Sequence, residues 1–184
     1  MRIPYLLVFC TMMLMTPVPS SATTMFHVSD LEQAQKSDAV VIATIGTAKT
    51  GPHPNKKSIM TETNILVEEV LAGNAPRFLT IRQMGGTLNG KTMYVPGDAR
   101  LNEGKKVVLF LHEENGHWYL TAMEQSKYEL SHHARLGWVM KRELHGGLVV
   151  RTSEGRLAPF KPPKKKPIQT LTEFKNTLRK GGVQ

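Results

Sequence analysis

Cysteine is nearly absent from this sequence. Cys10 is the only one among 184 residues, and it lies in an apolar run near the N-terminus. Val8 and Phe9 precede it, whereas small residues precede the cysteine of a lipoprotein, so lipidation is not expected. Without this run the chain has no thiol, which excludes disulfides, thiolate catalysis and cysteine-bound zinc. Packing must therefore stabilise the fold.

The N-terminal run has the pattern of an export signal. Arg2 supplies a positive start, residues 5–15 are apolar, and residues 20–22 (Ser-Ser-Ala) are small. A retained membrane anchor is the alternative, but the run is shorter than the roughly 20 residues of a span and two prolines interrupt its end. We expect residues 1–22 to be a cleaved signal peptide, and the protein to be exported to the periplasm or the extracellular space without a membrane span.

Acidic residues are scarce in the C-terminal tail. Residues 156–184 carry eight basic residues and one acidic residue, a net charge of +7, whereas residues 23–155 are nearly neutral at +1. The body therefore gives no reason to expect a specific nucleic-acid interface. Six cations of the tail could contact a polyanion: Lys161, Lys164, Lys165, Lys166, Arg179 and Lys180. The favoured alternative is a solubilising linker followed by a helix that docks on the body.

Catalytic signatures are missing as well. The sequence has no nucleophile elbow, phosphate-binding loop or dinucleotide fingerprint. His112 and His117 are five residues apart with a glycine between them, which is the wrong spacing for a zinc-binding helix. His132 and His133 are adjacent, with His145 further on, and adjacent side chains on a strand point to opposite faces. No catalytic, cofactor-binding or metal-binding residue is predicted, and no cofactor.

A long β-hairpin over residues 61–86 is the strongest structural signal. Thr61, Thr63, Ile65 and Val67 fall on one side of a period-two pattern. Residues 72–76 (Ala-Gly-Asn-Ala-Pro) form the turn between its strands. A hairpin alone is marginal in water, so further strands must bury its apolar side.

Such strands are predicted on both sides of the hairpin, each as a short run of β-branched or alternating apolar residues. They cover residues 39–47, 92–95, 105–112, 118–123, 127–130 and 148–151. Residues 131–147 fit either a strand, because Leu136, Trp138 and Met140 alternate, or a helix interrupted by Gly137.

Two capping boxes predict a short helix at each end of the mature chain. Ser29 and Glu32 begin a helix over residues 30–36, with Leu31 and Ala34 on its inner side. The second helix covers residues 170–180, and its apolar positions are Leu171, Phe174 and Leu178.

The sum of these elements is a mainly β fold, a small OB-like barrel of five to six strands with a short helix at each end, because closure removes exposed edges. We expect this domain to cover residues 23–155. Residues 156–184 are expected to form a basic Pro/Lys linker and a C-terminal amphipathic helix.

Several motifs in this order resemble a family of exported bacterial proteins with an OB-like barrel, related in outline to the netrin-like module of tissue inhibitors of metalloproteinases. The matching motifs are Ser-Asp-Ala-Val-Val at 37–41 with Gly46, residues 67–73, Leu-Thr-Ile at 79–81 with Gly85 and Gly86, Pro96-Gly97, residues 103–111 and residues 119–128. The resemblance covers residues 31–130 and implies a fold rather than an activity. Protease inhibition is not implied, because those inhibitors use an N-terminal cysteine that this chain lacks.

The sequence favours an exported, non-enzymatic β-barrel module that binds a protein or a component of the cell envelope. One alternative is a metal-assisted hydrolase that uses histidine and glutamate residues. Another is polyanion binding through the basic C-terminal tail.

The export prediction can be checked by mass spectrometry of protein from its native host. We expect a mature N-terminus near Thr23, because residues 20–22 present the small side chains that signal peptidase recognises. Recovery of the full-length chain from the cytosol would contradict it.

Overall fold

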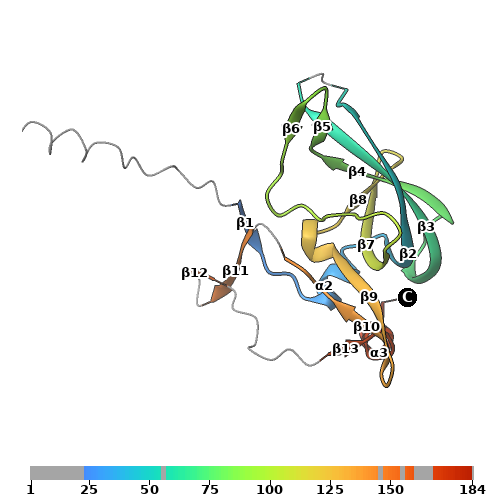
Figure 1. Ribbon diagram of the computed structural model, residues 1–184. Coiled ribbons are helices and arrows are strands. Elements are labelled where there is room, and N and C mark those ends of the chain that lie inside the picture. The colour runs from blue at the N-terminus through green and yellow to red at the C-terminus, as the bar shows by residue number, and fades with distance from the viewer. Residues whose placement is uncertain (1–22, 55–56, 145–146, 154–155, 160–167, 184) are drawn as a thin grey trace, which may run out of the picture.

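The computed structural model describes residues 23–54, 57–144, 147–153, 156–159 and 168–183 (Figure 1). The chain is mainly β, with two α-helices and one 3-10 helix in these ranges. In chain order, the elements are β1 (Thr23–Phe26), α2 (Asp30–Gln35), β2 (Ala39–Pro52), β3 (Ile59–Gly73), β4 (Phe78–Met84), β5 (Gly86–Leu88), β6 (Lys91–Met93), β7 (Lys106–Glu114), β8 (His117–Leu120), η1 (Met123–Ser126), β9 (Lys127–His133), β10 (Gly137–Lys141), β11 (Gly147–Ser153), β12 (Arg156–Pro159), β13 (Gln169–Thr170) and α3 (Leu171–Lys180).

Eight strands form one large sheet, in the order β13-β10-β9-β7-β2-β3-β4-β8, and β8 pairs a second time with β7. The strands β2, β3, β4, β8 and β7 thereby form a partial ring. Its weakest seam is between β4 and β8, which run parallel and pair at one position, Ile81 with Trp118. A second sheet has the order β1-β11-β12, with β1 parallel to β11.

The predicted hairpin is confirmed as β3 and β4. Thr63, Ile65 and Val67 are buried on its inner side. The turn after β3 requires glycine at position 73, where φ is +71° and a Cβ atom would lie 1.9 Å from the carbonyl oxygen of Asp38. The sequence thus specifies both the register of the hairpin and the place where it turns.

The inner face of the ring holds one hydrophobic core. Its buried side chains come from β2, β3, β4 and β7 at alternate positions, as expected for strands with one face toward a core. They are Ala39, Val41, Ala43, Ile45, Ile65, Val67, Leu79, Ile81, Val107, Leu109 and Leu111.

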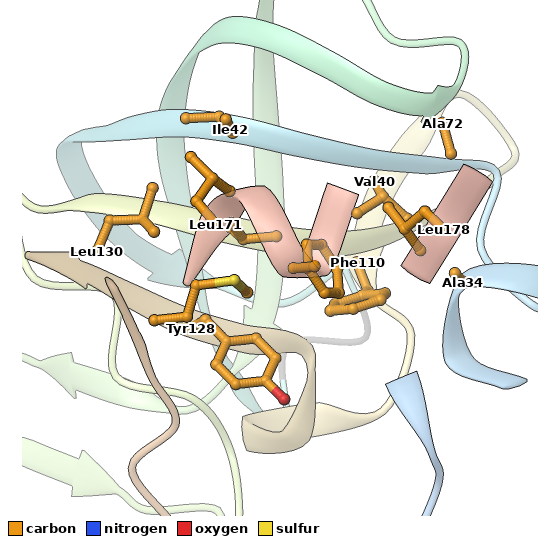
Figure 2. Packing of buried hydrophobic residues seen from close by; sticks show 12 residues of the cluster. Ala34, Val40, Ile42, Ala72, Phe110, Tyr128, Leu130, Leu171 and Leu178 are labelled. Carbon is orange, nitrogen blue, oxygen red and sulfur yellow. The ribbon is translucent and has the colours of Figure 1, made fainter. Parts of the chain in front are cut away.

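A second core lies on the outer face of the sheet, where α3 and α2 cover it (Figure 2). Leu171, Phe174 and Leu178 of α3 are 8%, 0% and 1% exposed. The Phe174 ring lies edge-on to Phe110 of β7, with 5.9 Å between the ring centroids. A ten-residue helix is unstable alone in water, so this packing accounts for its presence. The predicted docking of the C-terminal helix is confirmed.

The predicted capping boxes form to different extents. In α3 the Thr170 hydroxyl accepts from the Glu173 backbone N–H at 3.2 Å, and the Glu173 carboxylate accepts from the Thr170 backbone N–H at 2.9 Å. In α2 the Ser29 side chain accepts from the Glu32 N–H, but the Glu32 carboxylate pairs with Lys36 instead. The residues of α2 that face the core also differ from those predicted. Ala34 is buried as expected, but Gln33 is buried beside it and Leu31 is only partly buried.

The mainly β class and the helix near each end are confirmed, whereas the prediction of five to six strands is wrong. The described ranges contain thirteen strands. Four of them, β1, β5, β12 and β13, have no counterpart among the predicted strands; each has only two to four residues, and such runs are too short to carry a period-two signal. The strand predicted over residues 118–123 ends at Leu120, and Met123 begins η1 (Met123–Ser126).

The ambiguous segment after residue 131 forms a strand hairpin rather than a helix. Strand β9 extends to His133, and β10 pairs with it in antiparallel fashion from Gly137. Gly137 has a φ of +72°, which suits the end of a turn and not the interior of a helix. The alternation of Trp138 and Met140 was therefore the informative signal.

We expect Phe174→Ala to lower the melting temperature of the protein by about 10 °C, because truncating a buried Phe costs about 3–5 kcal/mol. Differential scanning calorimetry measures the change. The matched control is Thr172→Ala on the exposed side of the same helix, which should leave the melting temperature nearly unchanged. Equal melting temperatures for Phe174→Ala and the control would show that α3 does not contribute to the outer core.

Candidate functional site

The cations proposed to contact a polyanion are not brought together within the part of the chain that the structure describes. Lys161, Lys164, Lys165 and Lys166 lie outside the described residues. Arg179 and Lys180 are exposed in the last turn of α3, where positive charge stabilises the C-terminal end of the helix dipole. A third cation of the tail, Lys175, bonds the Glu69 carboxylate of β3 at 2.7 Å and so fastens α3 to the sheet.

The histidines that the sequence singles out lie apart from one another. His112 is on β7, where its ring stacks on Tyr119 with 5.4 Å between centroids, and His117 begins β8. His132 lies edge-on to Trp138 on the β9–β10 hairpin. His145 is outside the described residues. No three His, Cys, Asp or Glu side chains within the described ranges are placed to hold a metal ion together.

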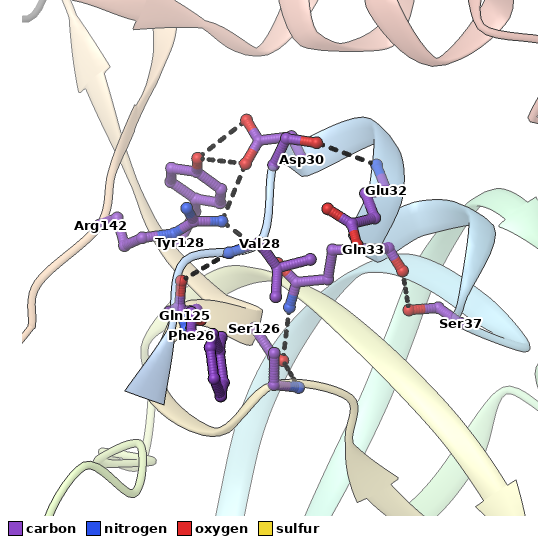
Figure 3. Close-up of polar contacts among 12 residues, drawn as sticks. Phe26, Val28, Asp30, Glu32, Gln33, Ser37, Gln125, Ser126, Tyr128 and Arg142 are labelled. Carbon is purple, nitrogen blue, oxygen red and sulfur yellow. Dashed lines mark hydrogen bonds and ion pairs between the residues drawn. The ribbon is translucent and has the colours of Figure 1, made fainter. Parts of the chain in front are cut away.

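A partly buried polar cluster joins α2 to the sheet, and most of its polar atoms bond one another (Figure 3). The Tyr128 hydroxyl donates to Asp30 at 2.8 Å, and Arg142 pairs with Asp30 at 2.9 Å while lying over the Tyr128 ring. Burial raises the pKa of the Tyr128 hydroxyl, so it remains a neutral donor. The amide of Gln33 lies 2.6 Å from the Ser126 hydroxyl. This arrangement fixes the position of α2, although the buried Nε of Arg142 makes no hydrogen bond within it.

The outward side chains of β4 form an open surface, which we call the β4 face: Phe78, Thr80, Arg82 and Met84. Phe78 is 70% exposed and Met84 is 42% exposed. Between them, Arg82 pairs with Glu62 at 2.8 Å and Thr80 donates to Asn64 at 3.3 Å, both across the hairpin to β3. Arg77 places its guanidinium 5.6 Å from the centroid of the Phe78 ring. Two large apolar groups are therefore held apart by an ordered polar centre.

Hollows lie at both ends of the β4 face. At the Phe78 end, an open groove of about 500 Å³ is lined by the end of β3 and by Arg77. At the Met84 end are two adjoining hollows of about 310 Å³ and 270 Å³, which share Gln83, Met84, Val95 and Asp98. Tyr94, which is 59% exposed, lines the first of these two. The surface thus continues beyond the strand in both directions.

The loop between β6 and β7 forms one wall of the two adjoining hollows, and partly buried polar contacts hold it. Asp98 accepts hydrogen bonds from the Gln83 amide and from the Ala99 N–H, both at 2.8 Å. Lys127 donates from its ammonium group to the Arg100 carbonyl at 2.6 Å. Burial lowers the pKa of the Lys127 ammonium group. These bonds preorganise the loop as a rigid edge of the surface.

Comparison of the chain with family models, curated proteins and solved structures gave no match. None of the helices formed by the described residues is sufficiently long and apolar to cross a membrane.

The β4 face was not predicted from the sequence. One signal was present, because Phe78 and Met84 are apolar residues on the side of the strand that also carries Thr80 and Arg82. A half-buried strand normally alternates between an apolar and a polar side. Apolar residues on the polar side indicate either a second core or an exposed surface, and the tertiary structure decides between them.

Asp98 allows a test of how the loop is held. Burial raises the pKa of its carboxyl group, the carboxylate of Glu124 adds to this, and the two hydrogen bonds oppose it. The ionised form is therefore disfavoured in the fold. The protonated Asp98 carboxyl group contributes to the stability of the fold. This contribution is complete below the ordinary carboxyl pKa of 3.8 and is lost as the pH rises through the folded-state pKa.

We expect Asp98→Asn to raise the melting temperature by about 3 °C at pH 7 and to have no effect at pH 3.5. The asparagine keeps the oxygen that accepts both bonds and removes the buried charge. Thermal unfolding at the two pH values measures the difference, with Glu103→Gln as the exposed control in the same loop. A lower melting temperature of Asp98→Asn at pH 7 would contradict this account.

Proposed function

We propose that this protein is an exported, non-enzymatic OB-like module that binds another protein through its β4 face. The order of the ring, β2-β3-β4-β8-β7, with β4 parallel to β8, supports the OB-like part of the proposal. OB-folds bind their ligands over the face of the second and third strands, which correspond here to β3 and β4. The ring of this chain leaves that face open, whereas the helices cover the outer face around β7.

The observation that carries the proposal is the composition of this surface. Phe78, Met84 and Tyr94 are exposed, and Arg77 and Arg82 lie beside them. Aromatic residues, methionine and arginine are enriched in protein interfaces, whereas lysine is depleted. Phe78 is the most exposed large apolar side chain within the described ranges. An exposed apolar side chain of this size favours aggregation and adds nothing to the core, whereas a bound partner would bury it.

A protein partner fits this surface better than an envelope polymer does. A polyanion would require unpaired cations along the strand, but Arg82 already pairs with Glu62. The central ion pair and the Thr80–Asn64 bond instead give an ordered polar centre between two apolar anchors. Protein interfaces use such apolar anchors for affinity and fixed polar groups for register.

Site-specific photocrosslinking in the native host tests the proposal. A photoreactive amino acid at position 78 or 84 should give a covalent adduct with one protein partner, which mass spectrometry of the adduct identifies. The matched control position is 136, where Leu136 is 46% exposed at the tip of the β9–β10 hairpin. Adducts at 136 but not at 78 or 84 would place the interface elsewhere and contradict the proposal.

Binding to the identified partner then measures the contribution of each anchor. We expect Phe78→Ala and Arg82→Gln each to raise the dissociation constant by about tenfold or more, because aromatic and arginine residues contribute most of the binding energy in protein interfaces. Leu136→Ala should leave it unchanged. If neither Phe78→Ala nor Arg82→Gln weakens binding, the partner does not use the β4 face.

A further inference from the structure

The smaller hollow at the end of β4 contains an unusual combination of donors. Met84 of β4, His112 of β7 and Met123 of η1 all line this hollow of about 270 Å³. They come from three separate elements, β4, β7 and η1. Residues 23–184 contain six methionines, so one third of them line one small hollow.

We propose that Met84, Met123 and His112 form a binding site for a soft monovalent metal ion, Cu(I) or its redox-inert analogue Ag(I). Thioether sulfur is a soft ligand that selects such ions, and imidazole nitrogen also suits copper. Methionine has three rotatable bonds, so both sulfur atoms can converge on an ion in the hollow. The site supplies two sulfur donors and one nitrogen donor.

The backbone at Met123 supports the assignment. Its φ is +52°, a left-handed conformation that is uncommon for a residue other than glycine. Such a conformation has an energetic cost and is often retained where it positions a functional side chain. Met123 begins η1, directly after the turn that follows β8. The strained backbone thus places this side chain in the hollow beside β4.

The side chain of His112 is held in place by a neighbouring aromatic ring. Its imidazole stacks on Tyr119 of β8, with an interplanar angle of 24°. Stacking fixes the plane of the imidazole beside the hollow that it lines. A positioned imidazole loses little freedom on binding an ion, which favours affinity.

The charges around the hollow are compatible with a monovalent cation. Glu114 also lines the hollow, and Arg82 is paired with Glu62. One carboxylate near the site attracts a monovalent cation, whereas hard divalent ions would require several oxygen ligands in close convergence. No such cluster of three His, Cys, Asp or Glu side chains occurs in the described ranges. The donor set therefore favours a soft ion over zinc or calcium.

This proposal does not depend on the protein-binding proposal, because it concerns the isolated protein. The experiment is a titration of purified protein, labelled with carbon-13 at the methionine methyl groups, with Ag(I) and separately with Zn(II). One equivalent of Ag(I) should shift the methyl signals of Met84 and Met123 and the ring signals of His112. The signals of Met60, Met93 and Met140 should not move, and Zn(II) should shift none of the methyl signals.

Three variants identify the donors. Met84→Leu, Met123→Leu and His112→Phe remove one donor each, and the phenylalanine keeps a ring against Tyr119. We expect each to weaken Ag(I) binding at least tenfold, whereas Met93→Leu, which lines only the neighbouring hollow, should not change it. Circular dichroism shows whether each variant remains folded. Unchanged Ag(I) affinity in folded Met84→Leu and Met123→Leu, equal shifts at all methionines, or tighter binding of Zn(II) at His112 would overturn the proposal.

Discussion

The burial of β7 on both faces is the constraint on which this structure depends. Val107, Leu109 and Leu111 point into the ring, Val108 and Phe110 point to the outer face, and all five are fully buried. A strand with two apolar faces needs cover on each side. The ring supplies the cover on the inside, and α2 and α3 supply it on the outside. The C-terminal helix is therefore part of the core of the fold, although a long stretch of chain precedes it.

Strand β4 is the opposite case. It has one buried side, toward the interior of the ring, and its other side is exposed. The helices are held near β7, β9 and β10, because the apolar residues that they cover lie there. The face of β4 is left open for this reason, and its exposed Phe78 and Met84 are the basis of the proposed protein interface. The division of the sheet into a covered half and an open half follows from the distribution of apolar residues along the strands.

The candidate site could be predicted only in part. Its individual components were visible in the sequence: the outward positions of β4, the turn residues of the loop after β6, and His112. Their proximity was not visible, since β4 and η1 are about forty residues apart. Sequence periodicity indicates which face a side chain occupies, but not which distant strand lies next to it. The hollow shared by Met84, His112 and Met123 exists only because β8 reaches both β7 and β4.

The sequence by itself determined the local structure: the hairpin of β3 and β4, the two buried faces of β7, and the helix that begins at the capping box of Thr170 and Glu173. These features depend on the alternation of side chains and on hydrogen bonds between near neighbours, which are fixed over a few residues. Tertiary structure decided the strands β1, β5, β12 and β13, the pairing between β4 and β8, and the hollows beside it. A strand of two to four residues has too few positions to specify its own conformation, so it forms only where a neighbouring strand supplies the hydrogen bonds that its backbone requires.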